Sequence, residues 1–173
     1  MVVINIYGGP GCGKSVVASE LFAEMKKLDF NCALVTEFAK ELVYRHQLDY
    51  DQLIILGEQY RRIQDVADKV DFVITDSPVL LSAVYADYNN NFNTPQFKDV
   101  CYQAHMQFHG VNILLERDFD HFETEGRVHT EQESKELDGL ILKVLGEYHI
   151  PYIKMKSSRA CKEILKMFYD GTI

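Results

Sequence analysis

The chain has 173 residues, of which 47% are hydrophobic and 25% charged, values that fit one globular domain with a full buried core. Its formal net charge of -8 at pH 7 excludes a generally basic surface, so a nucleic acid would need a local basic patch. The opening "MVVINIY" has neither the basic start of a signal peptide nor the length of a transmembrane helix, so we expect a cytoplasmic protein.

Apolar runs alternate with amphipathic stretches along the chain. Short β-branched and apolar runs predict buried strands at 2–7, 31–36, 71–76, 111–116 and 151–155. Apolar residues at helical spacing predict helices at 14–28, 37–46 and 51–69, on both sides of the turn-rich "YNNNFNTP", after Thr130 and at the end of the chain. In the helix over 51–69 the expected apolar stripe runs through Leu53, Leu56, Tyr60 and Ile63.

This alternation predicts an α/β fold of three layers, in which a five-stranded parallel sheet carries helices on both faces. We expect residues 1–173 to form one domain. In such a sheet the functional site lies at the carboxyl ends of the strands. Gly8, Glu37, Asp76 and Glu116 all fall at predicted strand ends.

The segment "GGPGCGKS" lies directly between the first strand and the first helix. Gly8, Gly13, Lys14 and Ser15 complete the phosphate-loop pattern G-x-x-x-x-G-K-[ST] in the structural context that the pattern requires. The glycines allow backbone N–H groups to turn inward around phosphate, and the helix N-terminus adds a partial positive charge. The sequence therefore predicts a P-loop NTPase fold that binds ATP and Mg²⁺. The loop residues expected to bind the nucleotide are Gly8, Gly9, Gly11, Cys12, Gly13, Lys14, Ser15 and Val16.

Within this loop, Lys14 is expected to reach the β- and γ-phosphates, while the Ser15 hydroxyl binds Mg²⁺. Asp76, at the end of an apolar strand, has the form of a Walker B carboxylate that holds Mg²⁺ or orients an acceptor hydroxyl. Its alternative role is to end the strand or cap the next helix. Glu37 has two interpretations as well, a general base for the acceptor or a first-turn Glu favoured by the helix dipole.

Further segments extend the pattern beyond the phosphate loop. The stretches "VTEFAKEL", "GEQYRRI", "VITDSPVLL" and "GRVHTEQESKELDGLILKVLGEYHIPYIKM", together with "GGPGCGKS", resemble small bacteriophage P-loop kinases related to ribosylnicotinamide and nucleoside kinases. Within that group the sequence is similar to phage kinases of 5-hydroxymethyluracil in DNA. The resemblance implies a host-cytoplasmic enzyme and spans nearly the whole chain.

The same resemblance implies a short lid at about 117–130 that closes over the donor. Arg117 and Arg127 are the arginines of this segment, and a guanidinium suits the charge on a transferring phosphoryl group. The alternative is a solvated loop with incidental arginines. Of the adjacent Arg61 and Arg62, at least one is expected on the surface.

Other residue patterns indicate no further chemistry. The four cysteines form no C-x-x-C pair and are interpreted as ordinary thiols. His105 and His109 could share a helix face but lack the Glu of a metalloprotease motif. The aromatic residues of "DYNNNFNTPQFKDVCYQ" either stack on a base or belong to the core.

Two classes of function fit the sequence. The first is a kinase that passes the γ-phosphate of ATP to a hydroxyl of a nucleoside, a nucleotide or a modified DNA base, with Lys14, Asp76, Glu37 and Arg127 as the catalytic candidates. The second is a nucleotide-driven switch without a phosphorylated substrate. The absence of an N-K-x-D motif argues against a GTPase, and the lid favours the kinase. The oligomeric state is left open.

Overall fold

The computed structural model describes residues 1–46, 51–118 and 130–171. Within them a five-stranded sheet has the order β2-β3-β1-β4-β5, and every neighbouring pair is parallel. The strands are β1 (Val2–Tyr7), β2 (Cys32–Val35), β3 (Phe72–Thr75), β4 (Gly110–Glu116) and β5 (Ile153–Lys156). The predicted α/β class with five parallel strands is confirmed.

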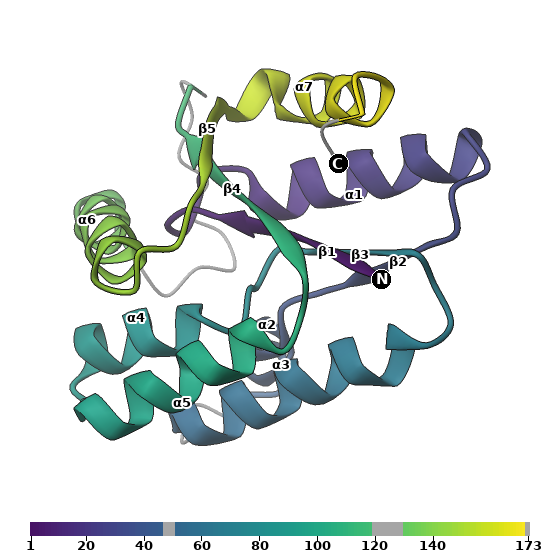
Figure 1. Ribbon diagram of the computed structural model, residues 1–173. Coiled ribbons are helices and arrows are strands. Elements are labelled where there is room, and N and C mark those ends of the chain that lie inside the picture. The colour runs from purple at the N-terminus through teal and green to yellow at the C-terminus, as the bar shows by residue number, and fades with distance from the viewer. Residues whose placement is uncertain (47–50, 119–129, 172–173) are drawn as a thin grey trace.

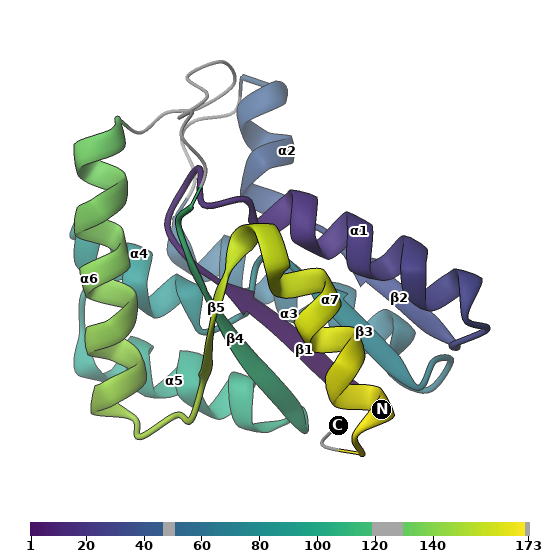
Figure 2. The ribbon, with the colours of Figure 1, turned by 90° about the horizontal axis from the view of Figure 1, so that it is seen from above.

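Helices cover both faces of this sheet, as predicted. They are α1 (Lys14–Lys27), α2 (Phe38–Tyr44), α3 (Gln52–Ala67), α4 (Leu81–Asn89), α5 (Pro95–Met106), α6 (Glu131–Glu147) and α7 (Ser157–Tyr169). Figure 1 shows α1 and α7 on one side of the sheet and α3, α4 and α5 on the other. Seen from above in Figure 2, α6 flanks the sheet beyond β4 and β5.

Two hydrophobic cores explain why the strands are apolar on both faces. Along β1, Val3 and Tyr7 enter the core shared with α3, α4, α5 and α6, whereas Ile4 and Ile6 enter the core shared with α1 and α7. The polar exception is Asn5, whose amide donates to Asn112 Oδ1 on β4 at 3.2 Å. A central strand that is buried on both faces fixes where its carboxyl end, and the loop after it, must lie.

Local sequence signals set several helix starts. Asp51 and Thr94 accept hydrogen bonds from Ile54 N and Phe97 N at the starts of α3 and α5. Thr130 and Glu133 form a reciprocal capping box at the start of α6. Such caps satisfy backbone N–H groups that have no partner inside the helix.

Some finer expectations were right and others wrong. All four cysteines are free thiols, as predicted, and all four are buried. Leu53 does not belong to the buried stripe of α3, because its side chain is 50% exposed while Leu56 and Ile63 are buried. His105 and His109 share no helix face, since α5 ends at Met106. In the part of the chain that the structure describes, every helix is too short or too polar to span a bilayer.

Packing of α6 against the core gives a direct test of the fold. Ile141 is 2% exposed, and Leu142, the next residue, is 38% exposed. Ile141→Ala should therefore lower the free energy of unfolding by about 2–5 kcal/mol, since it leaves a cavity in the core. Leu142→Ala is the matched control and should cost clearly less. Urea denaturation measures both, and equal losses would contradict this packing.

Candidate active site

The loop between β1 and α1 has a backbone that requires glycine. Gly11 and Gly13 have φ of 80° and 87°, in the left-handed region that other residues rarely adopt. A β-carbon at Gly8 would lie 2.3 Å from the sulfur of Cys12. The loop can therefore fold tightly only with glycines at these positions.

Lys14 and Ser15 begin α1 directly after this loop. Lys14 Nζ donates to Gly8 O at 2.7 Å and Gly9 O at 3.1 Å, so its ammonium lies against the loop backbone. Ser15 is exposed, and no side chain caps the N-terminus of the helix at Gly13. Helix N–H groups left without a side-chain cap are an anion-binding arrangement.

Asp76 follows β3, the neighbour of β1 in the sheet. Asp76 is 3% exposed, and among the described residues its Oδ1 atom has no hydrogen-bond partner. A buried carboxylate oxygen without a partner is costly, which suits a cation ligand. In the described ranges no group of three or more His, Cys, Asp or Glu side chains is arranged so that it could hold a metal ion. Ser15 and Asp76 therefore fit Mg²⁺, which is commonly held by one or two protein oxygens together with phosphates.

Glu37 follows β2 at the N-cap position of α2, where its side chain makes no capping hydrogen bond. Burial raises the pKa of Glu37, Lys14 lowers it, the Asp76 carboxylate raises it and Lys40 lowers it, with a net rise. Glu37 thus lies within the electrostatic field of both Lys14 and Asp76. Glu37 and Asp76 come from the ends of adjacent strands, and Lys14 follows the loop after β1, the next strand in the sheet. Glu116, the fourth residue predicted at a strand end, is exposed and pairs with Lys154 on β5 at 3.9 Å.

Arg117, one residue past β4, contacts the phosphate loop at Pro10. Its guanidinium donates to Pro10 O at 2.9 Å and to Asp138 Oδ2 on α6 at 3.0 and 2.9 Å, and it also bonds Ser134. Through these contacts Arg117 links the phosphate loop to α6. The expected contact of Arg117 with the donor stays a prediction, and Arg127 lies outside the described residues.

Ser134 and Asp138 are residues that sequence reasoning missed. Asp138 Oδ1 accepts from Gly9 N at 2.6 Å, and the Ser134 hydroxyl donates to Pro10 O. A β-carbon on Gly9 would lie 2.5 Å from Ser134 O, which explains the glycine. The N–H of Gly9 therefore points to α6. The one local signal was their i, i+4 spacing on a helix.

Cys12 and Val16 are the next two predicted nucleotide-binding residues. Cys12 is bonded by a residue of α7, and Val16 is exposed. Ser157 Oγ lies 2.6 Å from Cys12 O and 3.1 Å from Glu116 O, within hydrogen-bond reach of both carbonyls, which ties the loop to β4 and α7. Val16 is 63% exposed on the first turn of α1. Among the aromatic residues suggested for base stacking, Phe97 is buried and packs against Phe92 with ring centroids 5.5 Å apart.

A family match covers the sequence that forms this site. Residues 3–161 match the model of a family described as an AAA domain. The chain belongs to this family. No curated protein matches the sequence.

A solved structure shares the fold of this AAA domain. It is deoxyadenosine kinase from M. mycoides with the products dCMP and a flexible dCDP bound. The two proteins are 13% identical, with a TM-score of 0.61 over 98% of this chain and 100% of that one. At this identity the likeness shows a common P-loop α/β fold.

The support that Asp138 on α6 gives to the phosphate loop, called the brace below, can be tested through ATP binding. Asp138→Ala removes the acceptor of Gly9 N–H and the partner of Arg117, so the loop should lose its fixed shape. We expect the Kd of a non-hydrolysable ATP analogue to rise about tenfold, which corresponds to about 1.4 kcal/mol. Titration calorimetry measures the change. Glu136→Ala, at an exposed position of α6, is the control, and equal affinities in the two variants would refute the brace.

Proposed function

We propose that this AAA domain is an ATP-dependent kinase that transfers the γ-phosphate to a hydroxyl of a nucleoside-type acceptor. The observation that carries the proposal is the pair of carboxylates, Glu37 and Asp76, at the end of the sheet where Lys14 and the phosphate loop lie. In a kinase the second carboxylate takes the proton of the acceptor hydroxyl, whereas in a nucleotide switch it would act on water. The fold shared with a deoxyadenosine kinase favours the kinase.

On the donor side, the loop backbone and Lys14 bind the phosphates of ATP. Ser15 and Asp76 would hold Mg²⁺, which would supply positive charge at the phosphate oxygens. Arg127 is proposed to neutralise the charge that spreads over the transferring group. Arg117 contributes to donor binding through the loop that it contacts at Pro10.

On the acceptor side, Glu37 is the proposed general base. The acceptor oxygen forms a bond to the γ-phosphorus, the bond from that phosphorus to the bridging oxygen of ADP breaks, and the hydroxyl proton passes to the Glu37 carboxylate. Burial raises the pKa of this carboxyl, which makes its ionised form a stronger proton acceptor. Asp76 is the alternative base, with Glu37 then orienting the hydroxyl.

The resemblance to phage kinases favours one acceptor, the hydroxymethyl group of 5-hydroxymethyluracil in DNA. A base in a duplex would have to be flipped out or presented on a single strand. The net charge of -8 favours the second candidate, a free nucleoside or nucleoside monophosphate. A P-loop ATPase without an acceptor is the third.

The proposal is tested by following label from γ-labelled ATP. Deoxynucleosides, their monophosphates, 5-hydroxymethyldeoxyuridine and single- or double-stranded DNA containing the modified base form the acceptor panel. We expect label on at least one acceptor, and Lys14→Ala should abolish transfer because charge at the phosphates is no longer neutralised. Hydrolysis of ATP without transfer to any acceptor would support the switch instead.

The two carboxylates are separated by their response to Mg²⁺ and pH. Loss of the metal ligand Asp76, in Asp76→Asn, should be partly rescued by raised Mg²⁺, whereas loss of the base in Glu37→Gln should not. The raised pKa of Glu37 means that the ionised base is lost at a higher pH than for an ordinary carboxyl. The wild-type rate should therefore fall on acidification above the usual carboxyl range, and Glu37→Gln should lack this limb. Wild-type rates in both variants would refute the assignment.

A further inference from the structure

Gln59 is a polar side chain buried on the inner face of α3. It is 1% exposed, and its neighbours on that face, Leu56 and Ile63, are apolar core residues. Burying an amide is costly unless its hydrogen bonds are satisfied. The hydrogen-bond partners of this amide therefore indicate its structural role.

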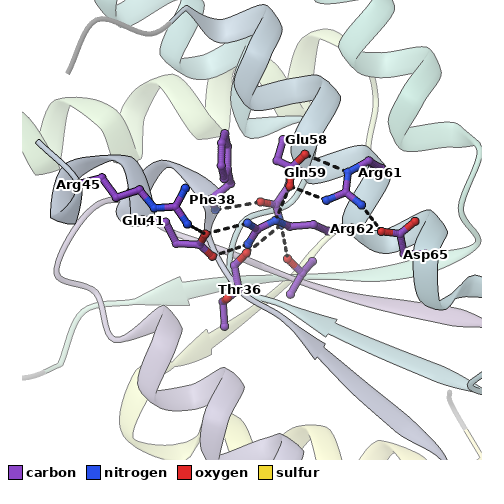
Figure 3. A network of polar contacts seen from close by, with 10 residues as sticks. Thr36, Phe38, Glu41, Arg45, Glu58, Gln59, Arg61, Arg62 and Asp65 are labelled. Atoms are coloured by element: carbon purple, nitrogen blue, oxygen red, sulfur yellow. Dashed lines mark hydrogen bonds and ion pairs between the residues drawn. The ribbon is translucent and has the colours of Figure 1, made fainter. Parts of the chain in front are cut away.

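The amide of Gln59 bonds the residues on both sides of Glu37. Gln59 Oε1 accepts from Phe38 N at 3.2 Å, and Gln59 Nε2 donates to Thr36 O at 3.4 Å. A backbone N–H can only donate and a carbonyl can only accept, so these partners fix which way the amide points. Figure 3 shows Gln59 between Thr36 and Phe38. The backbone on either side of Glu37 is thereby tied to α3.

The same nitrogen reaches the residues that flank Asp76. Gln59 Nε2 lies 3.4 Å from Thr75 Oγ1, and this hydroxyl also accepts from Ser77 N at 3.1 Å. Thr75 and Ser77 stand immediately before and after Asp76. One amide is therefore connected to the chain around both candidate carboxylates.

Arg62, three residues further along α3, strengthens the attachment to α2. Its guanidinium forms two bonds with Glu41 at 2.6 and 2.9 Å, and it lies 5.0 Å from the ring centroid of Phe38 (Figure 3). Phe38 is thus held at its N–H by Gln59 and at its ring by Arg62. Arg61 is the surface residue of the adjacent pair, 57% exposed and paired with Glu58 and Asp65.

We propose that Gln59 is a positioning residue that sets the placement of Glu37 and Asp76 relative to each other. This inference rests on the proposed kinase function. It adds a residue that acts through the two carboxylates and takes no part in the transfer itself. The contacts of Gln59 are with β2, β3 and the start of α2, and the phosphate loop is held separately from β4, α6 and α7. Loss of Gln59 should therefore affect the transfer step and leave ATP binding nearly intact.

The test compares Gln59→Leu with two controls on the same helix. Ile63→Ala removes a buried apolar residue, and Arg61→Ala removes an exposed one. For each variant, kcat and the KM for ATP are measured with the acceptor of the panel that the wild type phosphorylates fastest. The pKa of Glu37 is followed separately by NMR of ¹³C-labelled carboxyl groups, a readout that needs no acceptor.

We expect Gln59→Leu to lower kcat by about tenfold to a hundredfold, because small displacements of reacting groups cost that much, with KM for ATP within about twofold of wild type. The pKa of Glu37 should fall toward its ordinary value as the side chain loses burial. Ile63→Ala should lose stability but keep kcat and this pKa. Arg61→Ala should change none of them.

Gln59→Leu with unchanged kcat and unchanged Glu37 pKa would overturn the inference and leave Gln59 a purely structural residue. Thr75→Val provides a second variant if Gln59→Leu does not fold, since it removes the shared hydroxyl and keeps the amide. It should also lower kcat, and wild-type kcat in a folded Thr75→Val would count against the proposal. Full activity of Glu37→Gln and Asp76→Asn would refute the carboxylate roles instead, while the NMR titration still reports whether Gln59 positions Glu37.

Discussion

The parallel register of β2, β3 and β1 is the constraint on which the site depends. Thr75 pairs with Val35 on one side and with Asn5 on the other, so three strands reach the same edge of the sheet together. The segments that leave these strands are then brought into one place, whatever their distance along the chain. Glu37, Asp76 and the phosphate loop share an electrostatic environment because of this register and not because of any local motif.

Polar side chains at this edge have a different task from those in the cores. The two hydrophobic cores hold the sheet between its helices. At the carboxyl edge, buried or half-buried polar groups such as Gln59, Arg117 and Asp138 bond backbone atoms of the connecting segments. Backbone positions there are fixed directionally by hydrogen bonds, which packing alone does not provide.

The sequence predicted the fold well because its signals are local. The strand at Val2–Tyr7 and the helix from Lys14 result from a β-branched run, a glycine pattern and helical spacing. The same reasoning placed Leu53 on the wrong face, since three-residue spacing alone does not say where a stripe ends. Gln59, Ser134 and Asp138 were not found, because their roles depend on contacts with residues 16 to 129 positions away. Pairings of that kind are set by tertiary structure, and one sequence gives no sign of them.

The support of the phosphate loop from the distant end of the chain has a consequence for biosynthesis. The loop leaves the ribosome early, but its partners Arg117, Ser134, Asp138 and Ser157 are all translated much later. A nascent chain that contains the complete glycine motif therefore lacks the groups that hold Gly9, Pro10 and Cys12 in place. The loop geometry of the complete chain is therefore acquired late in synthesis, after α6 and the start of α7 have joined the sheet.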